Sequence, residues 1–357
     1  MNRPFWKDKK VLVTGHTGFK GSWISLWLQR MGTHVIGYSL PPPTKPSLFE
    51  IAGIEEGMTS IRGDIRDLDY LKSIMALHQP EIVIHMAAQS LVRYSYINPV
   101  ETYATNVMGT VNLLEAARQI KSAKVIIIVT SDKCYENKEW VWGYKENDPV
   151  GGHDPYSSSK GCAELVTAAY RNSFFSWDHA LHGVAVASVR AGNVIGGGDW
   201  AEDRLIPDIM KALMEDRPVL IRNPDAVRPW QHVLEPLRGY LLLTERLWTD
   251  GAGFSEAWNF GPKDEDARPV SWIAEKLVHQ WADSASWEPD KTLHPHEARY
   301  LKLDFSKARN LLGWTPKLNL LTALQWTLEW YRGYQQKKDM RHLTEAVIER
   351  YENIEEI

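Results

Sequence analysis

The sequence has little cysteine, no long apolar run and no dominant charge sign. Its 357 residues include only Cys134 and Cys162, which are too few to staple a chain of this length and do not form a Cys-x-x-Cys pair. The 41 basic and 45 acidic residues give a formal net charge of −4, which disfavours a surface that coats nucleic acid. We therefore expect a protein of a reducing compartment, the cytoplasm, with no nucleic-acid partner.

No segment predicts a membrane span or a secretory signal. A span needs about 18 uninterrupted apolar residues, and no stretch approaches that length. The first 15 residues hold only three consecutive apolar residues before Thr14, too few for the apolar region of a signal peptide. The composition, 44% hydrophobic and 24% charged, is ordinary for a globular chain, long enough for one large domain or two.

Short apolar runs alternate with segments of helical periodicity. The first unit has a β-branched run over 10–14, a glycine-rich turn, a helical pattern over 22–31 and a second apolar run over 34–38. Later apolar runs cover 82–88, 125–131 and 184–190, and helical patterns cover 69–78, 100–119 and 156–174. Near-continuous apolar strands between helices are typical of a parallel sheet covered on both faces. We predict an α/β fold with a doubly wound parallel Rossmann sheet and a smaller C-terminal α/β substrate domain.

The rhythm changes after residue 190, which suggests two domains. We assign 1–190 to a cofactor-binding domain, with 229–260 returning to it, and 191–228 together with 261–357 to a substrate-binding domain. The further elements that we expect are helices over 206–214, 235–248, 271–282, 320–334 and 340–357, and strands over 219–223 and 257–260.

GHTGFKG places Gly15, Gly18 and Gly21 between the first strand and the first helix. In this context the glycines allow a tight turn, close approach of a pyrophosphate and close packing of the helix, whose N-terminus stabilises the anion. The pattern predicts a bound dinucleotide; the alternative is a glycine-rich turn without a ligand.

The choice between NAD and NADP is left open by the second strand. It ends in Tyr38 and Ser39, where an acid that holds the ribose diol of NAD is usual. Lys20 offers a charge for a 2′-phosphate, although no Arg follows the strand. Asp64 and Ile65 of GDIRD lie in a loop similar to one that contacts adenine; alternatively, Asp64 caps the helix that follows.

Tyr156 and Lys160 lie four positions apart in a helical pattern, so their side chains share one face. An ammonium beside a phenol favours the phenolate, which would lower the pKa of the tyrosine and make it a base. The apolar run over 125–131 ends in Ser131, Asp132 and Lys133, and ligands of open parallel sheets bind outside such strand ends. Solvation of an ordinary loop is the plainer alternative.

Together these motifs resemble the extended short-chain dehydrogenase/reductases that act on nucleotide sugars. The glycine turn, HMAAQ, TNVMGT, YSSSK, RAGNVIGGGDW, RPWQHV and ARYLKLD match in order over nearly the whole chain. The resemblance implies NAD as cofactor, held by Gly15, Thr17, Gly18, Phe19, Gly21, Asp64, Ile65, Ala87, Ala88, Asn106, Tyr156 and Lys160. It also implies a nucleotide-sugar substrate held by Gln89, Asn193, Arg228 and Arg299.

Within that family the chain resembles the 4,6-dehydratases. These have Ser/Thr-Asp-Glu where this chain has Ser131-Asp132-Lys133, and the lysine, with SLPPPTKPSLF and RPWQHVLEPLRGYL, resembles the branch that acts on CDP-glucose. The implied product is CDP-4-dehydro-6-deoxyglucose, which supplies deoxysugars of lipopolysaccharide O-antigen. The alternatives are a dTDP- or UDP-sugar 4,6-dehydratase, a nucleotide-sugar 4-epimerase, or a non-catalytic NAD sensor, the last disfavoured because Tyr156 and Lys160 are intact.

The implied reaction gives each catalytic residue a role. Tyr156, assisted by Lys160 and Ser131, would take the proton of the C4 hydroxyl. Asp132 would protonate the departing C6 hydroxyl, and Lys133 would take the C5 proton, for which it must first be neutral. The alternative for Lys133 is a charged side chain that stabilises the enolate.

We expect no metal site and a homo-oligomer. His294, His296 and Glu297 form a short HPHE cluster, but His-x-His alone does not supply a third metal ligand, and Cys134 has no histidine partner at nucleophile spacing. Family likeness implies a homodimer or homotetramer through helices 100–119 and 156–174. The apolar faces of these helices could instead be buried within one chain.

Overall fold

The computed structural model describes residues 1–175, 183–282, 285–292 and 299–355. Its centre is a sheet of seven parallel strands in the order β11-β6-β5-β4-β1-β2-β3. The strands are β1 (Lys10–Thr14), β2 (His34–Ser39), β3 (Thr59–Arg62), β4 (Ile82–His85), β5 (Val125–Val129), β6 (Ala185–Ala191) and β11 (Ala257–Phe260). The doubly wound parallel sheet is therefore confirmed, and its order reverses between β1 and β4.

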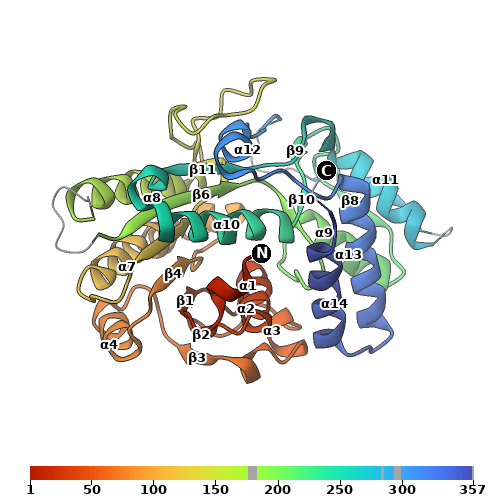
Figure 1. Cartoon of the computed structure of the whole chain (residues 1–357). Helices are drawn as coiled ribbons and strands as arrows, with labels where there is room; N and C mark the ends of the chain where they lie inside the picture. Colours follow the sequence, from red (N-terminus) through yellow and green to blue (C-terminus); the bar gives the residue numbers. More distant parts are fainter. Residues whose placement is uncertain (176–182, 283–284, 293–298, 356–357) are drawn as a thin grey trace.

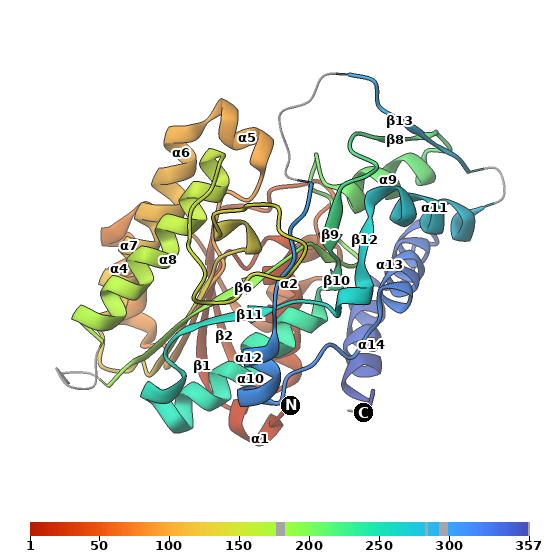
Figure 2. The same ribbon diagram turned by 90° about the horizontal axis from the view of Figure 1, so that it is seen from above.

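Helices cover both faces of this sheet, as Figure 2 shows. On one face lie α2 (Phe19–Arg30) and α10 (Leu234–Asp250); on the other lie α4 (Leu68–His78), α7 (Gly109–Ala117) and α8 (Pro155–Ser173). Alternate side chains of each strand enter two separate cores: Val125 and Ile127 of β5 pack on the α2 side, and Ile126 and Ile128 on the α4 side. Because successive side chains of a strand point to opposite faces of the sheet, a strand such as β5 that is covered on both faces is apolar at every position.

The strands predicted over 125–131 and 219–223 and the helix over 340–357 end two to five residues early, at Val129, Ile221 and Glu352. Two other expected elements differ more. The run over 82–88 ends as a strand at His85, because the backbone N–H groups of Met86 and Ala87 both donate to Thr14 Oγ1, at 3.1 Å each. The expected helix over 100–119 divides into α6 (Pro99–Tyr103), a π-helical turn (Ala104–Met108) and α7. A further helix, α5 (Val92–Ile97), was not expected.

The rest of the chain forms smaller units beside the carboxyl ends of the strands. The strands there pair in twos: β7 (Val194–Ile195) with β10 (Gln231–His232), β9 (Val227–Pro229) with β12 (Ala267–Pro269), and β8 (Val219–Ile221) with β13 (Trp287–Pro289). The helices are α9 (Leu205–Met214), α11 (Val270–Trp281), α12 (Ser306–Leu312), α13 (Leu320–Gln335) and α14 (Met340–Glu352). Short helices α1 (Arg3–Trp6) and α3 (Leu48–Ile51) complete the fold.

The last helix joins the two parts of the chain. Figure 1 shows α13 and α14 side by side, away from α4, α7 and α8. From α14, Glu352 accepts a hydrogen bond from Trp27 Nε1 at 2.9 Å, and Arg341 donates to Gln29 Oε1 at 3.0 Å, so α14 packs on α2 of the main sheet. The division into 1–190 with 229–260 and the remainder stays a prediction. No helix in the described ranges has the length and apolarity to cross a membrane.

Candidate active site

A cavity of about 1140 Å³ lies at the carboxyl ends of the central strands, where the sheet order reverses. In open α/β sheets this is where ligands bind. Its wall includes most of the residues that the motifs singled out: Gly15, Thr17, Gly18, Phe19, Gly21, Asp64, Ile65, Ala87, Ala88, Gln89, Ser131, Asp132, Lys133, Tyr156, Lys160, Asn193 and Arg228. The fold thus brings together segments that are far apart in the sequence.

Asn106 and Arg299, also expected in the site, do not line this cavity. Asn106 is buried in the π-helical turn, where its side chain accepts from Gln89 N–H at 2.8 Å and donates to Gln89 O and Ser159 Oγ. Arg299 is exposed and its carbonyl accepts from Arg228 at 3.2 Å. Asn106 therefore supports Gln89 from behind, and Arg299 lies next to Arg228 at the outer end.

The turn after β1 has the shape that a dinucleotide diphosphate needs. Gly15 has φ +73°, and a Cβ there would lie 2.8 Å from Ala87 N; a Cβ on Gly21 would lie 2.1 Å from Gly15 O. Larger residues at either position would push the turn apart. Gly18 begins the twelve-residue helix α2 at the cavity wall, so the N-terminal N–H groups of α2 can receive an anion. The residues present therefore fit NAD.

The end of β2 carries hydroxyl groups in place of the usual acid. Thr17 Oγ1 and Ser39 Oγ lie 2.8 Å apart. Lys20 is turned away from this end: its Nζ donates to Tyr240 Oη of α10 at 3.2 Å. The alternative role of Lys20 as a ligand of a 2′-phosphate is not supported by this placement.

Asp64 does not cap the next helix. Asp67 is the N-cap of α4 and accepts from Tyr70 N–H at 3.0 Å, whereas the Asp64 carboxylate pairs with the guanidinium of Arg66 at 2.6 Å. Hydrogen bonds from Arg66 lower the pKa of Asp64. The capping alternative is therefore wrong, and Asp64 remains a charged acceptor on the cavity wall.

The end of β5 presents Ser131, Asp132 and Lys133 on a short 3-10 turn. The Ser131 hydroxyl accepts from Lys133 N–H at 3.2 Å and donates to Asp132 Oδ1 at 2.8 Å. Asp132 is only 3% exposed, and burial raises the pKa of its carboxyl group. Within the described part of the chain, Asp132 Oδ2 is buried and has no hydrogen-bond partner. Asp132 is thus disposed to hold a proton and to give it to a ligand.

Helix α8 presents Tyr156 and Lys160 from its first turns. Asp154 caps the helix, and Tyr156 N–H donates to Ser95 Oγ at 3.2 Å. Burial lowers the pKa of Lys160 to about 8, and its Nζ lies 3.4 Å from Val129 O. Burial raises the pKa of Tyr156 to about 12, against a hydrogen bond with Ser131 that lowers it. The expectation that the tyrosine pKa is lowered is therefore wrong for this structure, because burial outweighs the hydrogen bond with Ser131.

Two further cations lie near this centre: Lys20, which the sequence suggested only as a ligand of a 2′-phosphate, and Arg204, which the sequence reasoning missed. Burial, with the charges of Lys160 and Arg204, lowers the pKa of Lys20 to about 7. Arg204 donates to Asp199 Oδ2 at 3.0 Å and to Ser90 Oγ at 2.8 Å, and its charge lowers the pKa of Tyr156. Lys20 lies within the glycine-turn motif GHTGFKG, which drew attention to it. Nothing in AEDRLIPD distinguishes Arg204 from a surface residue.

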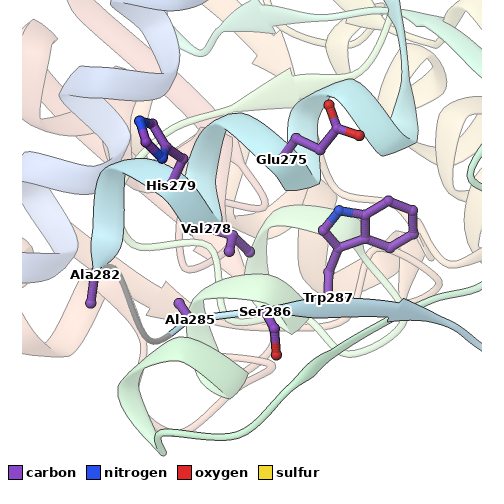
Figure 3. A pocket seen from close by; sticks show the side chains of 7 residues that line it. All are labelled: Glu275, Val278, His279, Ala282, Ala285, Ser286 and Trp287. Atoms are coloured by element: carbon purple, nitrogen blue, oxygen red, sulfur yellow. The ribbon is translucent and has the colours of Figure 1, made fainter.

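A second hollow, of about 480 Å³, lies between α11 and β13 (Figure 3). Glu275, His279 and Trp287 are among its lining residues, and none of the motif residues reaches it. It is open to solvent and contains no strand end of the main sheet, so the chemistry belongs to the first cavity.

The described residues hold no group of three or more His, Cys, Asp or Glu side chains that could bind a metal ion. His294, His296 and Glu297 lie outside the described residues. Cys134 is buried, and burial raises the pKa of its thiol, which disfavours the thiolate that nucleophilic catalysis needs.

Comparisons with known proteins point to one family. A family model described as GDP-mannose 4,6 dehydratase matches residues 12–327. A CDP-glucose 4,6-dehydratase of Salmonella typhimurium (strain LT2) is 57% identical over 98% of both chains. A dTDP-glucose 4,6-dehydratase of Streptomyces niveus is 28% identical over 90% of this chain and 93% of its own length.

Solved structures share the fold at lower identity. A dTDP-glucose 4,6-dehydratase from Bacillus anthracis in complex with NAD has a TM-score of 0.75 and 22% identity, covering 92% of this chain and 98% of its own. A UDP-glucose 4-epimerase of Thermotoga maritima with UDP-glucose has a TM-score of 0.76 and 23% identity, covering 91% and 99%. Both similarities concern the fold alone, over 91–92% of this chain.

Proposed function

Since the chain belongs to the GDP-mannose 4,6-dehydratase family of NAD-dependent nucleotide-sugar enzymes, we propose that it converts CDP-glucose to CDP-4-dehydro-6-deoxyglucose and water. The observation that carries the proposal is the joining, in one cavity, of Tyr156 and Lys160 with Ser131-Asp132-Lys133. Tyr156 and Lys160 suit oxidation at C4, and an acid beside an amine suits the elimination of water. The 57% identity to the CDP-glucose enzyme favours CDP over dTDP or UDP.

NAD is the cofactor. When bound, it would store the hydride that C4 loses until that hydride returns at C6. We assign its diphosphate to the turn of Gly15, Gly18 and Gly21, and its adenine end to the wall that holds Asp64. Arg228 and Arg299 lie on adjacent segments, bridged at Val227 and Tyr300, and we assign the substrate diphosphate to this pair.

Tyr156 accepts the proton of the C4 hydroxyl. Burial raises the pKa of Tyr156 to about 12, so deprotonation near neutral pH depends on nearby positive charge. Arg204 supplies such charge. Lys160 lies one helical turn from Tyr156 on the same helix, and we assign it the same role while it is protonated. The side chains of Arg204 and Lys160 both line the cavity where the sugar would lie.

The elimination needs a base that removes the C5 proton and an acid that protonates the departing C6 hydroxyl. Once C4 is a ketone, the C5 proton is acidic; Lys133 takes it, and Asp132 gives a proton to the departing C6 hydroxyl. Burial raises the pKa of Asp132, which keeps the acid form available. The alternative is that Lys133 only stabilises the enolate. In that case removal of Lys133 would slow the loss of the C5 proton but leave the pH dependence of that rate unchanged.

A labelled substrate tests the function. CDP-, dTDP- and UDP-glucose carrying deuterium at C4 are incubated with the enzyme without added reductant, and the products are analysed by NMR. We expect a 4-keto-6-deoxy product from CDP-glucose with the deuterium on C6, and no product from a Tyr156→Phe control. A C4 epimer, or a 4-keto product with unlabelled C6, would overturn the proposal.

We propose that the enzyme works as a homodimer or homotetramer in the cytoplasm, in the synthesis of O-antigen deoxysugars for lipopolysaccharide. Large apolar side chains of the expected interface helices are exposed: Val100 is 81% and Leu165 60% exposed, and Ile97, which precedes the first of these helices, is 78% exposed. They lie on α5, α6 and α8, which pack together. Light scattering on a Leu165→Arg variant should show a smaller particle than the parent; an unchanged mass would exclude this interface.

A further inference from the structure

We propose that Glu164 is a positioning residue, a buried carboxylate that ties helix α8 to the end of β5 and keeps Lys160 charged during the oxidation step. The role in oxidation rests on the proposed function; the effect on Lys160 does not. Glu164 follows Lys160 by one helical turn, away from the cavity, and lines no part of it.

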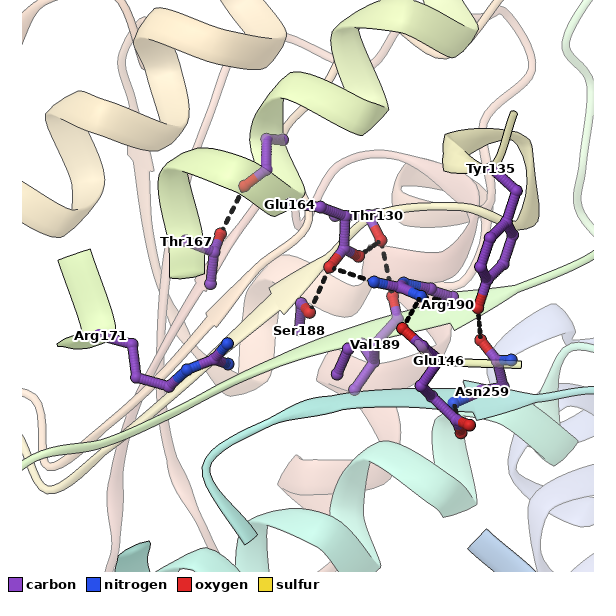
Figure 4. Close-up of polar contacts among 12 residues, drawn as sticks. Thr130, Tyr135, Glu146, Glu164, Thr167, Arg171, Ser188, Val189, Arg190 and Asn259 are labelled. Carbon is purple, nitrogen blue, oxygen red and sulfur yellow. Dashed lines mark hydrogen bonds and ion pairs between the residues drawn. The ribbon is translucent and has the colours of Figure 1, made fainter. Parts of the chain in front are cut away.

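The geometry of this carboxylate is that of a clamp between three elements (Figure 4). Its Oε1 accepts from Thr130 Oγ1 at 2.5 Å, and its Oε2 accepts from Ser188 Oγ at 2.6 Å and from Arg190 at 2.9 Å. Thr130 follows β5, and Ser188 and Arg190 belong to β6. Both Glu164 and Arg190 have side chains at most 5% exposed.

The clamp connects the two catalytic segments directly. Thr130 immediately precedes Ser131, while Glu164 is on the helix that carries Tyr156 and Lys160. On the other side, Arg190 donates to Tyr135 Oη at 2.6 Å and to Glu146 O at 3.1 Å, which holds the segment that follows Lys133. One carboxylate therefore fixes the distance between the phenol and the acid-amine pair.

The charge of Glu164 acts on Lys160. Burial would raise the pKa of Glu164, but the charge of Arg190 and the hydrogen bonds outweigh burial and lower it, so the carboxylate stays ionised. Burial lowers the pKa of Lys160 to about 8, and Glu164 leads the influences that raise it. Without Glu164, burial would act with less opposition and Lys160 would lose its proton at lower pH.

Other titratable and charged groups surround this pair. Cys134 also acts on Lys160, and Lys160 in turn lowers the pKa of Lys20 and His85. Arg171, about two turns further along α8, interacts with Glu164. Tyr156 responds to Asp132, Arg204 and Asp154. Among these groups, only Glu164 combines an acidic charge near Lys160 with hydrogen bonds to β6 and to Thr130, the residue that follows β5.

Two variants separate charge from clamping. Glu164→Gln removes the charge, whereas Thr130→Val removes one hydrogen bond and leaves the charge. The Lys160 titration is followed by NMR of lysine labelled with ¹³C at Cε, assigned with Lys160→Arg, in protein without ligands. We expect the midpoint to fall by on the order of one pH unit in Glu164→Gln and to stay in place in Thr130→Val.

The same variants are compared in the oxidation step. Single-turnover reduction of bound NAD by CDP-glucose is measured against pH. The alkaline limit of the rate should move to lower pH in Glu164→Gln, while Thr130→Val should lower the rate at every pH without moving that limit. A purely structural role predicts slower oxidation in both variants with an unmoved Lys160 midpoint, and that result would overturn the proposal.

Glu164→Gln leaves the Arg190 guanidinium without its buried acidic partner, which can unfold the protein. A second variant keeps the test open in that case. The double variant Glu164→Gln/Arg190→Met removes both charges and should give the same displaced Lys160 midpoint as the single variant. An unmoved midpoint in a folded double variant would refute the inference. Failure of the parent enzyme to act on CDP-glucose would refute the proposed function and leave the Lys160 titration as an independent result.

Discussion

Substitution of Asp132 by asparagine separates the oxidation of the sugar from the elimination of water. Asparagine has nearly the shape of aspartate, and its Oδ1 can still accept from Ser131 Oγ, a contact of 2.8 Å in the parent. What is lost is the acidic proton at the buried Oδ2, which has no partner among the described residues. The structure therefore predicts a defect in protonation of the C6 hydroxyl and little change in hydride transfer from C4.

The size of the defect follows from general acid catalysis. Loss of a positioned acid typically costs about 10² to 10⁴ in rate, or roughly 2.7 to 5.4 kcal/mol of transition-state stabilisation. Retention of the Ser131 contact should keep the oxidation rate of Asp132→Asn within about tenfold of the parent, since one typical hydrogen bond is worth only about 0.5–1.5 kcal/mol.

Rapid mixing with CDP-glucose gives the assay. The absorbance of reduced cofactor should rise in Asp132→Asn about as fast as in the parent and then persist, while quenched samples accumulate the 4-keto form of CDP-glucose with its C6 hydroxyl still attached. Parent-like formation of the 6-deoxy product would show that another group is the acid. Loss of the absorbance rise would show that Asp132 serves the oxidation itself, and either result would refute the assignment.

Three further substitutions follow from the same structure. Lys133→Ala should still oxidise C4 but should not exchange the C5 hydrogen with deuterated solvent; NMR showing unimpaired exchange would exclude Lys133 as the base. Burial lowers the pKa of Lys20 to about 7, so the unfolded chain holds a proton that the folded chain has released. Stability should therefore rise between about pH 7 and the ordinary lysine pKa of about 10.4, and Lys20→Met should remove that rise in urea titrations; an unchanged pH slope would contradict it. Tyr351→Phe removes a 2.7 Å hydrogen bond to the buried carboxylate of Glu235 and should cost about 1.5–3 kcal/mol in urea unfolding, whereas a loss below 0.5 kcal/mol on this order-of-magnitude scale would show that the contact contributes little.

The parts of the site that depend on local spacing could be predicted from the sequence. The glycine turn, the Tyr156-Lys160 pair and the strand that ends at Ser131 are each set within a few residues, and all of them line the cavity. Apolar runs likewise predicted six of the seven strands of the main sheet, because strands with two apolar faces leave a near-continuous signal. The exception is the edge strand β3 (Thr59–Arg62), whose residues are exposed or half-buried and form no apolar run.

What could not be predicted depends on contacts between distant segments. Lys20 meets Tyr240 only because α10 packs on the same face of the sheet as α2, and no local pattern contains that information. Asp67 rather than Asp64 caps α4, because in the turn after β3 the Asp64 carboxylate forms an ion pair with Arg66. The π-helical turn that carries Asn106 has no distinct periodicity over five residues.

The packing of α14 on α2 has a consequence for how the protein is made. Trp27 of α2 is fully buried, and its ring lies edge-on to Tyr351, about 325 residues later in the chain. Until α14 has been synthesised, Trp27 lacks its contacts with Tyr351 and Glu352. The packing around this part of α2 is therefore complete only once α14 is present.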